Sequence, residues 1–286
     1  MKKIIKLVYQ TIPFKHQLLK VIRFLVIPSK RIRDFLRFDG IVKVELDTGQ
    51  SFNLLNKNYA IENEFFWLGK SNTWERESLK IWQKLCLNKS IIFDIGANTG
   101  VYSLIAKTVN VNCEVFAFEP QPNIYDSLQS NANLNKFNIY CEQIALSNAN
   151  GKASFFNYGD SAFSGNTTAG SLNQKHRPND QHSIIVKCQT LSDYIENKKI
   201  INIDLIKLDV ETHEIEVING MGTYLEKFKP TILIEIIDNK IGDELHKIFS
   251  KLDYKYFYID DLKGVIKVDD LKQRECNNYI LTNHDL

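Results

Sequence analysis

The sequence predicts a doubly wound α/β fold with a Rossmann-like, mostly parallel sheet of about seven strands. From residue 90 onward, short and almost continuously apolar segments alternate with segments of helical periodicity, as expected for strands covered on both faces. The residues between the last two strand candidates show no helical periodicity. They therefore suit an antiparallel pair, which reverses one strand near the sheet edge.

The expected elements follow from this alternation. Strands are expected at residues 91–95, 114–118, 139–145, 205–210, 231–237, 254–259 and 279–282. Helices are expected at residues 101–109, 123–135, 215–228 and 243–252. We assign this whole part of the chain, residues 90–286, to one domain because its strands would share one sheet.

Two regions precede this domain. Residues 39–89 are expected to form a small accessory region, with short strands around a turn at residues 47–49 and a helix at 74–87. Thr73 is the expected N-cap of that helix. Residues 1–38 form a basic amphipathic segment in which Lys6, Pro13 and Pro28 interrupt the apolar residues. It therefore lacks the roughly 20 apolar residues needed to cross a bilayer.

The charge is unevenly distributed. Residues 1–37 hold ten of the 36 Lys and Arg residues but one of the 34 acidic residues, and the rest of the chain has 26 basic and 33 acidic residues. Because a nucleic-acid-binding domain would carry its basic surface on the folded part, this pattern argues against nucleic acid as a partner. Two interpretations of residues 1–37 stay open: peripheral contact with an anionic membrane face, or helices packed on the domain.

The cysteines indicate the compartment. There are five, widely spaced and without a CxxC pair, which argues against a disulfide framework or a zinc site. This usage favours a cytoplasmic protein. If residues 1–37 bind lipid, the protein would be peripheral at the inner face of the membrane.

The strongest motif is FDIGANTG, residues 93–100, between an apolar strand and a helical pattern. In open α/β sheets, ligands bind at the carboxyl ends of the strands, where this motif lies. Gly96 would let the backbone turn and approach a ligand, and Gly100 would allow close strand–helix packing. Asp94 offers a carboxylate suited to a cationic amino group. Ala97 and Asn98 complete the expected cofactor loop.

A dinucleotide is the rival ligand for this loop. The dinucleotide fingerprint has the spacing GxGxxG, whereas this chain has Gly96, Asn98 and Gly100 in the spacing GxNxG. The carboxylate of Asp94 would also repel a pyrophosphate. S-adenosylmethionine has no phosphate and carries an ammonium group, so the motif favours S-adenosylmethionine as the cofactor.

Two further strand ends would complete the cofactor site. Glu119 lies 19 residues after Gly100, at the end of the next expected strand, where a carboxylate can accept hydrogen bonds from both hydroxyls of a ribose. The third strand ends near Gln143 and Ala145, which lie at the level expected for the adenine.

Four ordered blocks, FDIGANTG, FAFEPQP, ALSNANG and IKLDVETHEIEVINGM, resemble the FkbM family of methyltransferases over residues 90–252. The resemblance implies the class I methyltransferase fold and transfer of a methyl group from S-adenosylmethionine to an oxygen, in polyketide and glycan pathways. It favours a saccharide or lipid-linked glycan as the acceptor. One departure is that Thr212 stands where the family commonly has glycine.

The fourth block carries the candidate catalytic residues Asp209, Glu211, His213 and Glu214. A sugar hydroxyl needs help to lose its proton, so we expect Asp209 or His213 to act as the base, with Glu211 and Glu214 orienting it or the acceptor. Structural alternatives stay open: acids in a first helical turn interact with the helix dipole, and Thr212 could be the N-cap. A divalent cation held by Asp209, Glu211 and His213 is the less favoured alternative.

The polar stretch at residues 159–183 lacks periodicity and is expected either to be a loop over the acceptor site or a surface loop without contacts. Phe163, His176 and Arg177 are its candidate contacts.

Two rival functions remain: a methyltransferase with a nitrogen or carboxylate acceptor, and a non-catalytic S-adenosylmethionine-binding module. The acidic block argues against the second, because binding alone needs no ionisable groups on the acceptor side.

Overall fold

The computed structural model describes residues 9, 13–69, 74–157, 170–174, 182–284 and 286. The chain forms two compact units, residues 1–74 with 160–167, and residues 75–159 with 168–286. Helix α5 (Arg76–Cys86) therefore belongs to the larger unit, whereas the sequence interpretation began that domain at residue 90. Within the described ranges, no helix is both long and apolar enough to cross a bilayer.

The described residues of the smaller unit form three helices and a hairpin. The helices are α2 (Lys15–Leu25), α3 (Lys30–Phe35) and α4 (Ala60–Leu68), and the hairpin joins β1 (Asp39–Glu45) to β2 (Ser51–Lys57) through the expected turn. Its core is aromatic, since the rings of His16 and Phe38 stack at 4.6 Å and Phe66 meets Phe38 edge-on. Leu19 is the one fully buried residue of α2.

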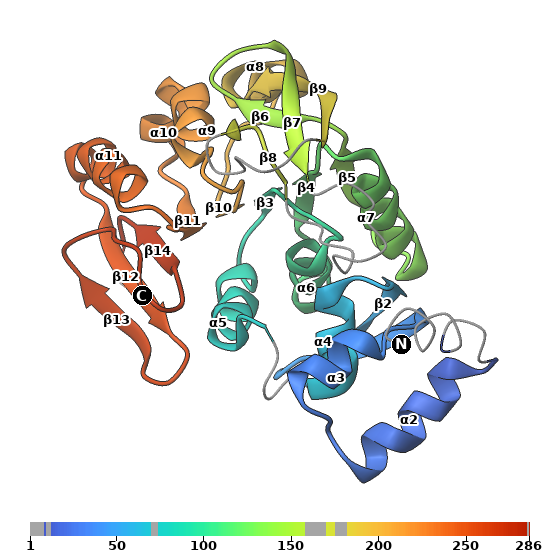
Figure 1. Cartoon of the computed structure of the whole chain (residues 1–286). Helices are drawn as coiled ribbons and strands as arrows, with labels where there is room; N and C mark the ends of the chain where they lie inside the picture. The colour runs from blue at the N-terminus through green and yellow to red at the C-terminus, as the bar shows by residue number, and fades with distance from the viewer. Residues whose placement is uncertain (1–8, 10–12, 70–73, 158–169, 175–181, 285) are drawn as a thin grey trace. The chain divides into compact units, whose positions relative to one another are not determined.

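The larger unit is built on an eight-stranded sheet in the order β13-β12-β14-β11-β10-β3-β4-β5 (Figure 1). The strands are β3 (Ile91–Ile95), β4 (Glu114–Phe118), β5 (Ile139–Glu142), β10 (Leu205–Leu208), β11 (Thr231–Glu235), β12 (Lys255–Asp260), β13 (Gly264–Val268) and β14 (Asn278–Thr282). Strands β5, β4, β3, β10 and β11 are parallel, and β14 runs antiparallel to β11 and to β12. The mostly parallel sheet with an antiparallel strand near its edge is confirmed, and β13 is an additional edge strand.

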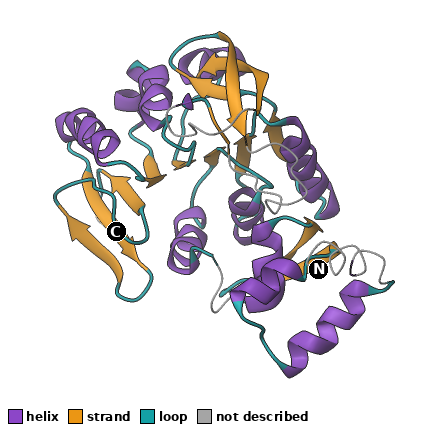
Figure 2. Cartoon of the chain, viewed as in Figure 1, coloured by secondary structure: helices purple, strands orange, loops and turns teal. Residues whose placement is uncertain are grey.

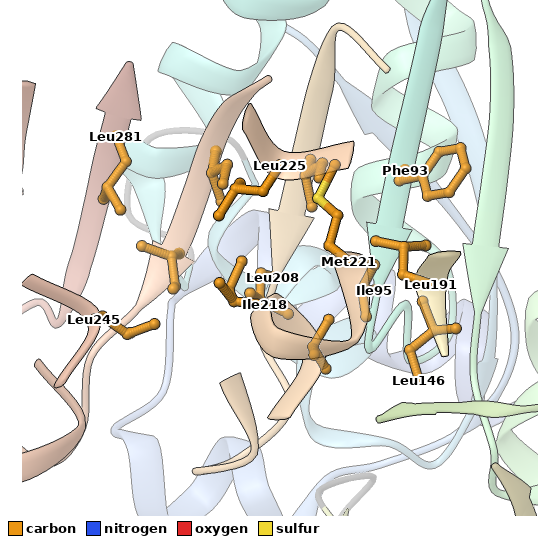
Figure 3. Close-up of a cluster of buried hydrophobic side chains, with 14 of the residues drawn as sticks. Phe93, Ile95, Leu146, Leu191, Leu208, Ile218, Met221, Leu225, Leu245 and Leu281 are labelled. Atoms are coloured by element: carbon orange, nitrogen blue, oxygen red, sulfur yellow. The ribbon is translucent and has the colours of Figure 1, made fainter. Parts of the chain in front are cut away.

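Helices cover both faces of this sheet, as the alternation of strands and helices predicts (Figure 2). Helices α5, α6 (Val101–Val109) and α7 (Pro122–Leu134) pack on one face. Helices α8 (Leu191–Lys198), α9 (Glu214–Met221) and α11 (Asn239–Phe249) contribute to the apolar core on the other, together with α10 (Thr223–Phe228). Figure 3 shows part of this core, where Met221 and Leu225 lie among side chains from the sheet.

A second sheet replaces part of one expected strand. The segment 139–145, expected as a single strand, is two strands: β5 ends at Glu142, and Ala145 begins β6 (Ala145–Ser147). Strand β6 belongs to a four-stranded sheet in the order β6-β9-β7-β8, with β7 (Gly151–Asn157), β8 (Gly170–Ser171) and β9 (His182–Thr190). The sequence interpretation did not foresee this sheet.

Three helix limits differ from expectation. The helix expected at 215–228 is divided at Gly222, whose φ of 56° lies in the left-handed region. Helix α11 begins at Asn239, because the side chain of Asp238 accepts a hydrogen bond from the backbone N–H of Lys240. Helix α5 has Glu75 at its N-cap position, and Thr73, which was expected there, lies outside the described residues.

Candidate active site

A pocket lies at the carboxyl ends of β3, β4 and β10. This is the position where the chain reverses its order of adding strands, with β4 on one side of β3 and β10 on the other, and open α/β sheets bind their ligands there. The lining residues are Ile95, Gly96, Asn98, Phe118, Glu119, Pro120, Ile144, Ala145, Leu146, Phe155, Gly170, Leu172, Asp209, Val210, Glu211 and His213.

The glycine loop, residues 96–100, connects β3 to α6 and is hydrogen-bonded to the end of β4. The backbone N–H groups of Gly96 and Ala97 donate to the carbonyl oxygen of Phe118 at 3.0 and 2.9 Å. Gly96 has a φ of 79°, and a Cβ there would lie 1.8 Å from the carbonyl oxygen of Asp209. Gly100 has a φ of 94°, and its Cβ would lie 2.6 Å from the side chain of Leu128. Both positions therefore require glycine, for conformation and for space.

The carboxylate of Glu119 is held against this loop. It accepts hydrogen bonds from the backbone N–H of Asn98 at 3.1 Å and of Gln121 at 2.9 Å, one on each oxygen. Glu119 is 5% exposed, and burial raises its pKa to about 7. Because each carboxylate oxygen has a second lone pair, the group can still accept hydrogen bonds from two neighbouring hydroxyls.

Not every residue expected at the cofactor lines the pocket. Asp94 is buried, accepts a 2.6 Å hydrogen bond from the hydroxyl of Ser103 and has a pKa raised by burial to about 6. It lies outside the lining, as do Ala97 and Gly100. Gln143 is exposed between β5 and β6, whereas Ala145 lines the pocket.

A buried cation stands beside the pocket. Lys207 is 1% exposed, and its Nζ lies 3.2 Å from the Oδ2 of Asp209. Burial lowers the pKa of Lys207, but the charges of Asp209, Glu75 and Glu235 outweigh this effect and raise it overall. Tyr102 donates a 2.5 Å hydrogen bond to Glu75. No sequence motif predicts this cluster, although the lysine inside the apolar strand LIKL is a local signal of it.

The candidate catalytic residues of the fourth block differ in position: three line the pocket and one is buried beside it. Asp209, Glu211 and His213 line the pocket. Glu214 does not, and it is 1% exposed. One oxygen of Glu214 accepts from the backbone N–H groups of Val210 and Thr212 at 3.2 and 3.3 Å, and burial raises its pKa to about 8. Glu214 therefore stabilises the loop that carries the other three residues.

Both ring nitrogens of His213 have partners. Its Nε2 lies 2.9 Å from the hydroxyl oxygen of Ser147, and its Nδ1 lies 3.5 Å from a carboxylate oxygen of Glu216. Burial lowers the pKa of His213 despite the opposing effect of Glu216. The sequence gave no signal for Ser147, because it comes from β6 of the second sheet.

The backbone of the block is strained at Thr212. Glu211 and Thr212 have φ values of 54° and 76°, and a β-branched residue rarely adopts that conformation. Asn173 donates a hydrogen bond to the Thr212 hydroxyl at 2.9 Å, and the hydroxyl of Ser171 donates to the Glu211 carbonyl at 2.6 Å. The left-handed conformation at the family's glycine position is thus kept without glycine.

The structure corrects the expected N-cap of α9 and describes only part of the polar stretch at residues 159–183. His213 is the N-cap of α9, so the alternative that Thr212 caps this helix is wrong. Of the stretch expected to cover the acceptor, Phe163, His176 and Arg177 lie outside the described residues. Within the described part, Gly170 and Leu172 line the pocket.

The lining fits a sulfonium nucleoside better than a dinucleotide. No Lys or Arg is among the described residues that line the pocket, whereas Glu119, Asp209 and Glu211 are acidic. Such a lining disfavours a pyrophosphate and suits a ligand with positive charge and a ribose. Across the described ranges, no cluster of three His, Cys, Asp or Glu side chains is arranged to hold a metal ion.

Comparisons with known proteins identify methyltransferases as relatives of this chain. The chain is 25% identical over 188 residues to the hexuronic acid methyltransferase AglP of Haloferax volcanii, a match that covers 66% of this chain and 73% of that protein. It is 28% identical over 153 residues to the 31-O-demethyl-FK506 methyltransferase FkbM of Streptomyces tacrolimicus, covering 46% of this chain and 59% of that protein.

A solved structure, the methyltransferase FkbM from Methylobacillus flagellatus, matches 68% of this chain and 43% of its own length, with 13% identity and a TM-score of 0.43. The family model described as the methyltransferase FkbM domain matches residues 94–256, more than half of the chain. The protein therefore belongs to the FkbM family of methyltransferases, enzymes with a Rossmann-like fold that use S-adenosyl-L-methionine.

Proposed function

We propose that this enzyme methylates a hydroxyl oxygen of a saccharide, free or lipid-linked, with Asp209 as the base. One observation carries the proposal: a carboxylate paired with a buried lysine, Lys207, lines the pocket of a methyltransferase. A relative that is a hexuronic acid methyltransferase supports a saccharide acceptor, and a relative that is a 31-O-demethyl-FK506 methyltransferase supports transfer to an oxygen.

The cofactor side of the pocket is assigned to the strand ends of β3 and β4 and to β6. Glu119 would accept hydrogen bonds from the ribose hydroxyls, since its orientation is set by two backbone N–H groups. Ile144, Ala145 and Leu146 supply an apolar wall for the adenine. When bound, the cofactor supplies a methyl group on a positively charged sulfur.

Asp209 would remove the acceptor proton. A sugar hydroxyl is a weak nucleophile, and a positioned base contributes about 10²–10⁴-fold to the rate. The side chain of Asp209 is 22% exposed while Lys207 is nearly inaccessible. Lys207 therefore compensates the carboxylate charge from the buried side. As the acceptor oxygen gains the methyl group, its proton would move to Asp209.

His213 is better suited to positioning than to proton abstraction. A neutral imidazole has one acceptor nitrogen, and both nitrogens of His213 already face Ser147 and Glu216. We therefore favour Asp209 over His213 as the base. Glu211, which also lines the pocket, would orient the acceptor hydroxyls.

The test is transfer of a labelled methyl group from S-adenosylmethionine to a panel of glycans and uronic acids, followed by mass spectrometry of the product. Asp209→Asn should lower kcat at least 100-fold while cofactor affinity stays within a few-fold of wild type. Asp243→Asn, at an exposed position of α11, is the matched control and should retain most of the activity. Methylation of amines or carboxylates alone, or full activity of Asp209→Asn, would contradict the proposal.

A further inference from the structure

We infer that the exposed apolar face of helix α2, flanked by basic residues, docks the protein onto an anionic lipid bilayer. The inference is independent of the proposed acceptor. It concerns the smaller unit alone.

The apolar residues of α2 face outward. Leu18, Val21 and Leu25 follow the spacing of one helix face, and their exposed fractions are 46%, 59% and 74%. Phe14, the residue before the helix, is 76% exposed. Leu19, on the opposite side, is 1% exposed. The helix thus uses its other side for packing within the unit and leaves a continuous apolar strip uncovered.

The exposed apolar surface is wider than this strip. Phe24 is 90% exposed, Val26 and Ile27 in the segment after the helix are 57% and 55% exposed, and Ile32 and Phe35 of α3 are also exposed. A helix partner in a coiled coil covers a narrow seam formed by two positions per heptad. This surface is too broad for that and has the spread expected of a lipid-facing element. An apolar surface of this kind is unfavourable in water unless it has a partner.

The basic residues around this apolar surface indicate which kind of partner covers it. Lys20, Arg23, Lys30 and Arg31 are exposed around the apolar residues, and Asp34 is the one acid between residues 13 and 37. A second copy of this chain would bring like charges together. An anionic bilayer instead supplies negative headgroups for the lysines and arginines and an acyl layer for the apolar side chains.

The experiment is flotation of the full-length protein with phosphatidylcholine vesicles, with and without phosphatidylglycerol, at physiological salt. Binding is expected to the vesicles that contain phosphatidylglycerol and to be at least tenfold weaker to pure phosphatidylcholine. Leu18→Ser with Phe24→Ser should weaken binding about tenfold or more. The matched control is Ile201→Ser with Leu262→Ser, which removes two residues that are 85% and 92% exposed elsewhere.

The charge is tested separately. Lys20→Gln with Lys30→Gln should weaken binding to phosphatidylglycerol vesicles about tenfold, and Lys251→Gln, at an exposed position of the larger unit, should not. Thermal unfolding of each variant checks that the fold is intact. The inference is wrong if wild type ignores the anionic vesicles, or if the α2 variants bind them as wild type does. It is equally wrong if the Leu18 and Phe24 variant alters only the oligomeric state in sedimentation.

Discussion

A Cβ atom on Gly96 would lie 1.8 Å from the carbonyl oxygen of Asp209. The glycine loop after β3 and the segment after β10 therefore meet backbone to backbone. Gly96→Ala should destabilise the protein by about 2 kcal/mol or more and abolish measurable cofactor binding. Gly264→Ala is the control, because Gly264 has a similar φ of 76° with nothing within 4 Å, and it should cost about 1 kcal/mol. Urea unfolding and calorimetric titration with S-adenosylmethionine measure both effects, and equal stability of the two variants would refute the contact.

The role proposed for Glu119 predicts a loss of affinity without a loss of fold. Glu119→Gln removes a charged acceptor, and a hydrogen bond to a charged group contributes roughly 1.5–3 kcal/mol. The dissociation constant of the cofactor should therefore rise about 10- to 100-fold in calorimetric titration. Glu114→Gln, at the exposed start of the same strand, should leave it unchanged. Unaltered affinity in Glu119→Gln would rule out ribose recognition by this residue.

The strained position at Thr212 predicts an unusual order of stabilities. Thr212→Gly should be more stable than Thr212→Ala by roughly 1 kcal/mol, because both lose the hydrogen bond from Asn173 and only alanine keeps the cost of the left-handed conformation. Thr231 lies in strand β11 and is buried, so there the alanine variant should be the more stable of the pair. Denaturant unfolding of the four variants tests this order, and alanine exceeding glycine at residue 212 would contradict it.

Buried carboxyl groups predict that stability falls as the pH rises. Burial raises the pKa of Glu214 from 4.5 to about 8 and that of Glu119 to about 7. The folded state then binds more protons than the unfolded state, so the stabilisation is complete below about pH 4.5 and is lost as the pH rises through 7 to 8. Each group contributes a slope of about 1.4 kcal/mol per pH unit inside its window.

Urea unfolding at pH 5, 6.5 and 8 provides the measurement. Glu214→Gln keeps a carbonyl oxygen for the N–H groups of Val210 and Thr212 but does not titrate, so its stability should depend less on pH than that of wild type. Glu244→Gln, at an exposed position of α11, should follow wild type. Parallel pH curves for Glu214→Gln and wild type would show that Glu214 does not hold its proton in the folded protein.

The parallel half of the sheet could be predicted from the sequence almost to the residue. Strands β3 and β4 and helix α6 have the limits that the apolar pattern indicates, because strands covered on both faces leave a strong local signal. The break at Gln143 carried no such signal. Nothing local distinguishes a strand that continues from one that changes sheets, and β6 is defined by its pairing with β9, more than 40 residues later.

The candidate site divides in the same way. Gly96, Glu119 and Asp209 could be found from motifs, since backbone turns and strand ends are local features. Ser147 and Glu75 could not, because they meet His213 and Tyr102 only through the tertiary fold. Thr212 marked the departure from the family pattern, but its φ of 76° became apparent only in the folded backbone.

The position of β14 has a consequence for biosynthesis. Residues 278–282 come after all other strands of the main sheet in chain order, yet β14 lies between β11 and β12 and pairs with both. During translation, β11 and β12 are therefore made without the neighbour that joins them, and their apolar edges stay open until residue 282 has left the ribosome. The nascent chain thus exposes aggregation-prone strand edges from the synthesis of β11, at residue 231, until residue 282 is added, which is the interval in which a chaperone would be of most use.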